Sequence, residues 1–130
     1  MNTERPQLLL VEDNPADANL VEEALAEVNL DCDLAIVRDG AQAVDFIDRL
    51  EHPPALVLLD LNLPKISGEA VLERLRSSPH GKTAKVLVIS SSDAPADRER
   101  VKKLGATDYF RKPTSLAEFM QLGPLVKAML

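Results

Sequence analysis

The sequence predicts an α/β domain in which five parallel strands form one doubly wound sheet. Apolar runs typical of buried strands alternate five times with segments whose apolar residues recur at helical spacing. Such alternation favours a parallel sheet with right-handed crossovers and helices on both faces. The expected strands span about 7–11, 33–37, 55–59, 85–90 and 107–110, and the expected helices about 15–28, 40–50, 68–76, 94–104 and 115–129.

The helical segments carry boundary signals that support this division. Asn14 followed by Pro15 resembles an N-cap with a proline in the first turn, and Asp39 can cap the second helix. The segment 94–104 has few apolar residues, which indicates low local stability. The last segment contains Gly123-Pro124, and because proline lacks a backbone donor we expect a kink or an early break there.

Length and composition narrow the class of protein. We expect residues 1–130 to form a single domain with no attached output domain. The formal net charge of -6 and the 3% aromatic content argue against a nucleic-acid or anionic-membrane surface. No apolar stretch approaches the roughly 20 residues of a membrane span, and no signal-peptide pattern is present, so we expect a cytoplasmic protein. Cys32 is the only cysteine and is expected to be a structural thiol.

Polar residues follow four of the expected strands. Glu12 and Asp13 follow the first, Asp60 the third, Ser90 ends the fourth, and Lys112 lies just beyond the fifth. In a parallel sheet the carboxyl ends of the strands meet at one edge, and ligands bind there in open α/β folds. We therefore expect these side chains to form one pocket.

The residue types in this pocket suit phosphoryl transfer. Glu12, Asp13 and Asp60 bring together carboxylates whose repulsion a hard cation relieves, and Mg²⁺ suits such oxygen ligands best. Lys112 supplies a positive charge on a flexible stem, and Ser90 supplies a hydroxyl donor for a phosphoryl oxygen. Because positioning and charge neutralisation carry most of this chemistry, the pocket predicts an acceptor for a phosphoryl group.

Four stretches, in this order and spacing, resemble the CheY-like receiver domain of response regulators over almost the whole chain. They are Leu8–Asn14, Leu58–Pro64, Val88–Ser90 and Tyr109–Pro113. The resemblance implies a flavodoxin-like (βα)5 fold with strand order 2-1-3-4-5. It also implies a two-component phosphorelay, in which Asp60 takes a phosphoryl group from a phosphohistidine on a histidine kinase or a histidine phosphotransfer protein.

The resemblance also implies a metal-ligand set. By it, Asp13 and Asp60 ligate Mg²⁺, the backbone carbonyl of Asn62 is a third ligand, and Glu12 binds the ion through water or directly. Glu12 stands where aspartate is commoner in the family, which leaves its mode of binding open.

Further roles follow from the same resemblance. Ser90 and Lys112 hold the phosphoryl oxygens. Tyr109 matches an aromatic switch position, whose ring turns inward when Ser90 moves toward the phosphoryl group. The bond between Lys112 and Pro113 is expected to be cis.

Two stretches indicate a narrower placement within the family. Glu12–Asp17 and Leu61–Lys65 resemble small single-domain receivers that serve phytochrome-type or hybrid histidine kinases. Without an output domain, output passes through protein contacts, and the sequence leaves a monomer and a homodimer open.

Two other functions remain open on the same residues. A small aspartyl-nucleophile phosphohydrolase would use Asp60, Ser90 and Lys112, but the chain lacks an acidic residue two positions after Asp60, where a general acid or base would sit. A phosphorylation-independent interaction module on the same fold would need none of the pocket groups.

Overall fold

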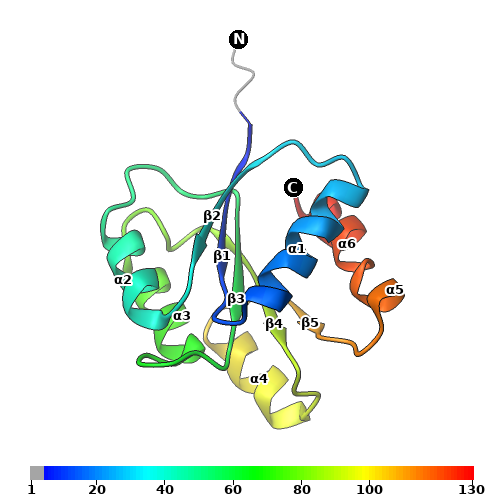
Figure 1. The fold of residues 1–130 in the computed structure, drawn as a ribbon. Coiled ribbons are helices and arrows are strands. Elements are labelled where there is room, and N and C mark those ends of the chain that lie inside the picture. Colours follow the sequence, from blue (N-terminus) through cyan, green and yellow to red (C-terminus); the bar gives the residue numbers. More distant parts are fainter. Residues whose placement is uncertain (1–4) are drawn as a thin grey trace.

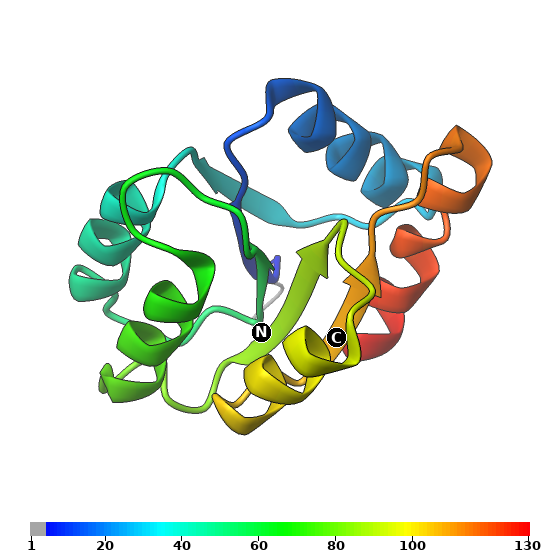
Figure 2. The ribbon, with the colours of Figure 1, turned by 90° about the horizontal axis from the view of Figure 1, so that it is seen from below.

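A parallel sheet of five strands forms the centre of the molecule, with helices on both of its faces (Figures 1 and 2). The computed structural model describes residues 5–130. The strands are β1 (Gln7–Val11), β2 (Asp33–Val37), β3 (Leu56–Asp60), β4 (Lys85–Ser90) and β5 (Asp108–Arg111). Their spatial order is β2-β1-β3-β4-β5 and every pairing is parallel, as predicted.

The helices divide into two groups, one on each face of the sheet. α1 (Pro15–Glu27), α5 (Leu116–Phe119) and α6 (Leu122–Met129) cover one face, and α2 (Gly40–Asp48), α3 (Gly68–Ser77) and α4 (Pro95–Lys103) cover the other (Figure 1). Across residues 5–130, no helix combines the length and the apolar content needed to cross a membrane.

Successive side chains of the central strands point to opposite faces of the sheet, and this alternation creates two hydrophobic cores. Leu8 and Leu10 of β1 pack with α1 and α6, whereas Leu9 and Val11 pack with α2 and α3. Each of these four side chains is at most 2% exposed. Full burial of a leucine side chain contributes roughly 1.5–3 kcal/mol. Because β1 and β3 are buried on both faces, the residues at their carboxyl ends are held on a rigid base.

The expected last helix is two helices separated by Met120 and Gln121, so a break is present, but it lies before Gly123-Pro124, where it was predicted. Pro124 occupies the third position of α6, where a helix needs no backbone donor, and the preceding helix ends before it. Gly123 packs so closely on the Ala24 carbonyl of α1 that a side chain at this position would collide with it.

The Lys112–Pro113 bond is trans, because no peptide bond among the described residues is cis. The prediction of a cis bond is therefore wrong. Trans is the form that most X–Pro bonds adopt in folded proteins.

Candidate functional site

The carboxyl ends of β1, β3, β4 and β5 bring the predicted polar residues to one end of the sheet, the end that faces the viewer in Figure 2. Asp60 is the last residue of β3 and Ser90 the last of β4, and both are buried. The Glu12 backbone N–H bonds to the Val37 carbonyl at 3.0 Å, which extends the β1–β2 ladder by one residue. The Lys112 backbone N–H likewise bonds to the Ser90 carbonyl at 2.8 Å.

The Lys112 ammonium lies among three carboxylates. Its Nζ is 2.8 Å from Glu12 Oε1 and 3.3 Å from Asp60 Oδ2, and it donates a hydrogen bond of 2.9 Å to Asp17 Oδ2. Burial alone would lower the pKa of Lys112, but the bonds to Glu12 and Asp17 and the charge of Asp60 outweigh it and raise the pKa. Lys112 therefore carries its positive charge at neutral pH.

Glu12 is the most deeply buried acid of the site, with 1% of its surface exposed. Burial is the main cause that raises its pKa from 4.5 to about 7, and the neighbouring Asp60 carboxylate adds to the rise while Lys112 opposes it. Its Oε2 accepts the Asn14 backbone N–H at 3.2 Å. Its Oε1 is fully buried, and the Lys112 ammonium lies 2.8 Å from it.

The acidic residues can hold a metal ion. Glu12, Asp13 and Asp60 each present an oxygen within 4.8 Å of the others, and no other such group occurs within residues 5–130. Carboxylates this close together repel one another, and a bound cation relieves that repulsion. Oxygen-only donors suit a hard cation such as Mg²⁺. Asn62 lies beside this cluster, and its backbone N–H donates to Asp60 Oδ1 at 3.1 Å.

The hydroxyl and the aromatic residue meet at the loop after β4. Ser90 Oγ accepts the Ser92 backbone N–H at 3.1 Å, and the Tyr109 hydroxyl donates to the Ser92 carbonyl at 2.8 Å. The Arg98 guanidinium of α4 lies 4.4 Å from the centre of the Tyr109 ring. Ser92 thus connects the pocket hydroxyl with the tyrosine at the edge of the sheet.

Asp17 is the one residue of the site whose place the sequence analysis missed. It lies in the first turn of α1, far along the chain from Lys112. An acidic residue in the first turn of a helix is common, because it interacts favourably with the helix dipole. The available signal was therefore too general to place Asp17 in the pocket.

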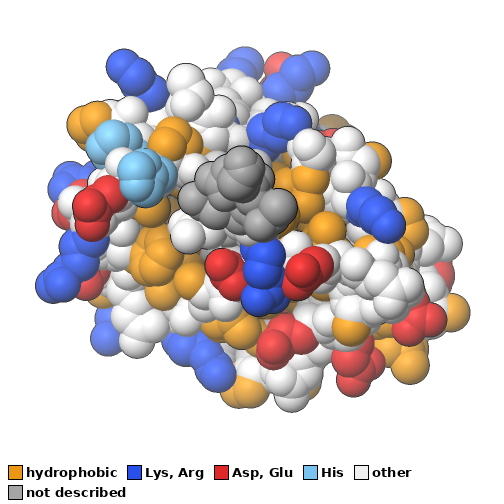
Figure 3. Space-filling model, turned by 90° about the horizontal axis from the view of Figure 1, so that it is seen from above, with side chains coloured by type: hydrophobic (Ala, Val, Ile, Leu, Met, Phe, Trp, Pro, Cys, Tyr) orange, Lys and Arg blue, Asp and Glu red, His pale blue; other side chains and the backbone are white. Residues whose placement is uncertain are grey.

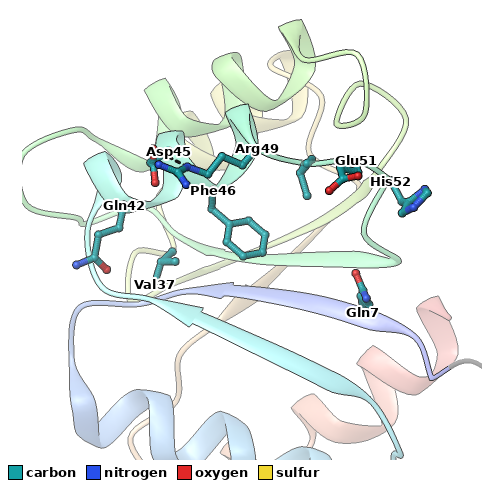
Figure 4. A pocket seen from close by; sticks show the side chains of 9 residues that line it. Gln7, Val37, Gln42, Asp45, Phe46, Arg49, Glu51 and His52 are labelled. Carbon is teal, nitrogen blue, oxygen red and sulfur yellow. Dashed lines mark hydrogen bonds and ion pairs between the residues drawn. The ribbon is translucent and has the colours of Figure 1, made fainter.

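Two other surfaces of the molecule carry none of these groups. A hollow of about 660 Å³ lies between α2 and the β1–β2 side of the sheet, and Phe46 points toward it (Figure 4). The amino end of the sheet, seen in Figure 3, presents charges of both signs with histidine side chains among them. The hollow is lined by Gln7, Val37, Gln42, Asp45, Phe46, Arg49, Leu50, Glu51 and His52.

Residues 8–122 match the family model of the response regulator receiver domain. The chain belongs to this family. Its resemblance to receiver domains, predicted from the four motif stretches, is confirmed, and the molecule is a receiver domain homologous to response regulators of two-component systems.

Similar proteins include receivers of phytochrome systems. The receiver is 36% identical over 120 residues to the response regulator Rcp1 of Synechocystis sp. (strain PCC 6803). The aligned region covers 88% of this chain and 82% of Rcp1. The phosphorylated cyanobacterial phytochrome response regulator RcpA is 34% identical, with a TM-score of 0.86 over 95% of this chain and 91% of RcpA.

A metal-bound relative is also similar in structure. The receiver domain of the sensor histidine kinase PA1611 from Pseudomonas aeruginosa PAO1 has a magnesium ion in its active-site cleft. It is 27% identical, with a TM-score of 0.75 over 93% of this chain and 96% of that domain.

Proposed function

We propose that this receiver is a phosphoacceptor switch of a two-component phosphorelay and that Asp60 is the residue that accepts the phosphoryl group. The observation that carries the proposal is the position of Asp60. Its carboxylate ends a strand buried on both faces, lies within 4.8 Å of Glu12 and Asp13 oxygens, and faces Lys112 Nζ at 3.3 Å. A buried carboxylate so close to two other acids is costly unless the site uses it.

In the proposed reaction an oxygen of the Asp60 carboxylate attacks the phosphorus of a phosphohistidine. The new P–O bond forms as the P–N bond breaks, and the electron pair of that bond returns to the imidazole nitrogen, which takes up a proton from solvent. The phosphoryl oxygens keep their negative charge throughout. The Lys112 ammonium and the Ser90 hydroxyl are placed at the same end of the sheet to pair with these oxygens.

The pocket fits a magnesium ion. Glu12, Asp13 and Asp60 would hold it, together with the backbone carbonyl of Asn62 as the family resemblance implies. When bound, Mg²⁺ supplies charge neutralisation for the attacking carboxylate and the phosphoryl oxygens. This assignment is supported by the cluster of oxygen donors and by the metal-bound relative.

The donor in this proposal is a histidine kinase or a histidine phosphotransfer protein, and residues 1–130 work as one receiver domain in the cytoplasm. The chain acts on no substrate other than its own phosphoryl group. The phytochrome relatives favour a phytochrome-type or hybrid kinase as the source.

The switch is proposed to run through the loop after β4. A phosphoryl group draws the Ser90 hydroxyl inward, and Ser92, which bonds to both Ser90 and Tyr109, follows. Tyr109 then loses its present acceptor and turns, and α4 shifts with the loop. The phosphoryl group thereby biases an equilibrium between two conformations through contacts made in only one of them.

The test is incubation with acetyl phosphate and Mg²⁺, followed by the mass of the intact protein. Wild type is expected to gain one phosphoryl group, and Asp60→Asn to gain none. Asp48→Asn, which changes an aspartate of α2 outside the pocket, is the matched control and should behave as wild type. Equal uptake by Asp60→Asn would overturn the proposal, and Asp60-dependent turnover of a simple phosphate ester would favour the phosphohydrolase.

A further inference from the structure

We infer that Asp17 is a positioning residue for the reaction at Asp60, an inference that rests on the proposed function. Asp17 gives the Lys112 ammonium an acceptor outside the acidic cluster, in addition to its contacts with Glu12 and Asp60. When a metal ion takes the oxygens of Glu12 and Asp60, Lys112 keeps this acceptor and stays beside the pocket, where a phosphoryl group can reach it.

The contacts of Lys112 show how closely Asp17 holds its ammonium. The hydrogen bond to Asp17 is 2.9 Å long and the one to Asp60 is 3.3 Å, while Glu12 Oε1 lies 2.8 Å from the ammonium. Asp17 therefore holds the ammonium about as closely as Glu12 does. A lysine side chain has a flexible stem, so its charge can stay with Asp17 when a cation takes Glu12 and Asp60.

The three carboxylates also differ in the roles that they can have in the reaction. Glu12 and Asp60 belong to the group of oxygens that can hold a cation, and Asp17 does not. An ammonium placed between Glu12 and Asp60 would compete with Mg²⁺ for the same oxygens. When Asp60 becomes an acyl phosphate and Glu12 serves the ion, Asp17 is the acceptor that Lys112 still has.

The local fold fixes Asp17 in place. It is the third residue of α1, and the Asn14 side chain caps the helix by accepting the backbone N–H groups of Ala16 and Asp17 at 2.9 and 3.3 Å. Pro15 at the first position restricts the backbone of this turn. The side chain of Asp17 is 27% exposed, compared with 13% for Lys112, so it lies at the mouth of the pocket.

A purely structural role would leave a different signature. An acid in the first turn of a helix stabilises that helix through the dipole. That effect acts on folding and does not depend on Lys112. A role through Lys112, in contrast, must disappear when the lysine is removed, and a double-mutant cycle measures this dependence.

The experiment measures Mg²⁺ affinity from amide chemical shifts at Asp13 and Asn62, at one pH and without a phosphoryl donor. In Asp17→Asn the ammonium has no carboxylate outside the cluster to which it can withdraw, so it keeps competing for Glu12 and Asp60, and Mg²⁺ binding weakens about fivefold. Lys112→Met removes the competing charge and strengthens Mg²⁺ binding. In that background Asp17→Asn changes the affinity by less than about twofold.

Two control variants accompany the cycle. Asp17→Glu keeps a carboxylate that can reach Lys112 and should stay within about twofold of wild type. Glu23→Gln removes an exposed acid from the same helix and should have no effect. Denaturant unfolding of every variant confirms that the compared proteins are folded.

The outcomes separate this inference from the proposed function. An unchanged affinity in Asp17→Asn, or the same loss with and without Lys112, would overturn the role of Asp17, since the second result is what a general charge effect gives. A wild type that binds Mg²⁺ but gains no phosphoryl group from acetyl phosphate would overturn the proposed function. The Mg²⁺ comparison would still decide the role of Asp17.

Discussion

Strand β3 and helix α4 lie on two sides of the pocket, and they are held in the fold in opposite ways. All five residues of β3 are buried, and the strand pairs on both sides with β1 and β4. In α4, by contrast, Val101 is the one buried residue, and no side chain caps the helix at its N-terminus. The proposed phosphoacceptor Asp60 therefore rests on a rigid element, whereas α4 can move without disrupting the core.

Charged surface contacts take the place of apolar packing in α4. Arg98 pairs with Asp93 at 3.2 Å, and Arg100 pairs with Asp97 and with Glu69 of α3. Ion pairs between exposed side chains contribute little to stability, because water and salt screen them. The molecule thus holds the proposed reacting atoms rigidly and holds loosely the helix that is proposed to move in response.

The largest expected effect comes from one substitution made in both regions. Leu58→Ala in β3 should lower the free energy of unfolding by about 3–5 kcal/mol, because it leaves a cavity in a fully buried layer. Leu104, which follows the last turn of α4, is half-buried, so Leu104→Ala should lower the free energy of unfolding by less than about 2 kcal/mol. Denaturant unfolding measures both, and equal losses would contradict the contrast between β3 and α4.

A smaller effect concerns the charge inside the rigid region. The pKa of Glu12 is raised from 4.5 to about 7. Between pH 4.5 and about 7 the metal-free native state therefore keeps a proton on Glu12 that the unfolded state has released. The stabilisation is fully present below about pH 4.5 and is lost as pH rises through about 7, by up to about 3 kcal/mol.

Denaturant unfolding at pH 5 and pH 8 checks this prediction, with Mg²⁺ removed. Glu12→Gln, which cannot ionise, should flatten the difference between the two conditions. A pH dependence that is the same in wild type and Glu12→Gln would assign the titration to another group.

The smallest expected effect on stability comes from a substitution in α4. Arg98→Ala removes the contact with the Tyr109 ring and the ion pair with Asp93, and it should cost about 0.5–1 kcal/mol. Amide signals near Ser92 and Tyr109 should nevertheless shift. A loss as large as that of Leu58→Ala would show that α4 is held more firmly than its contacts indicate.

The rigid region is also the part that the sequence predicts best. Apolar runs that stop at Asp60 and Ser90 mark buried strands and the edge where they end, because a charge or hydroxyl cannot continue a buried strand without cost. The parallel order of the strands then brings these residues together.

Features that depend on distant neighbours were not predictable in the same way. Asp17 and Lys112 meet across 95 positions of the chain, and no local pattern connects them. Pro124 predicts a break in the last helix, but the break lies at Met120 and Gln121, before the proline. The isomer of the Lys112–Pro113 bond depends on an energy difference of only about 0.5–1 kcal/mol, which sequence alone does not determine.

The most direct test identifies the aspartate that carries the phosphoryl group. Borohydride reduces the acyl phosphate of an aspartate to homoserine, and trypsin then separates the candidates. Asp60 is the only aspartate between the cleavage sites at Arg49 and Lys65, whereas Asp13 and Asp17 lie in the peptide that ends at Arg38. We predict homoserine at position 60 after treatment with acetyl phosphate and Mg²⁺. Homoserine at Asp13 or Asp17, with Asp60 unchanged, would contradict the account.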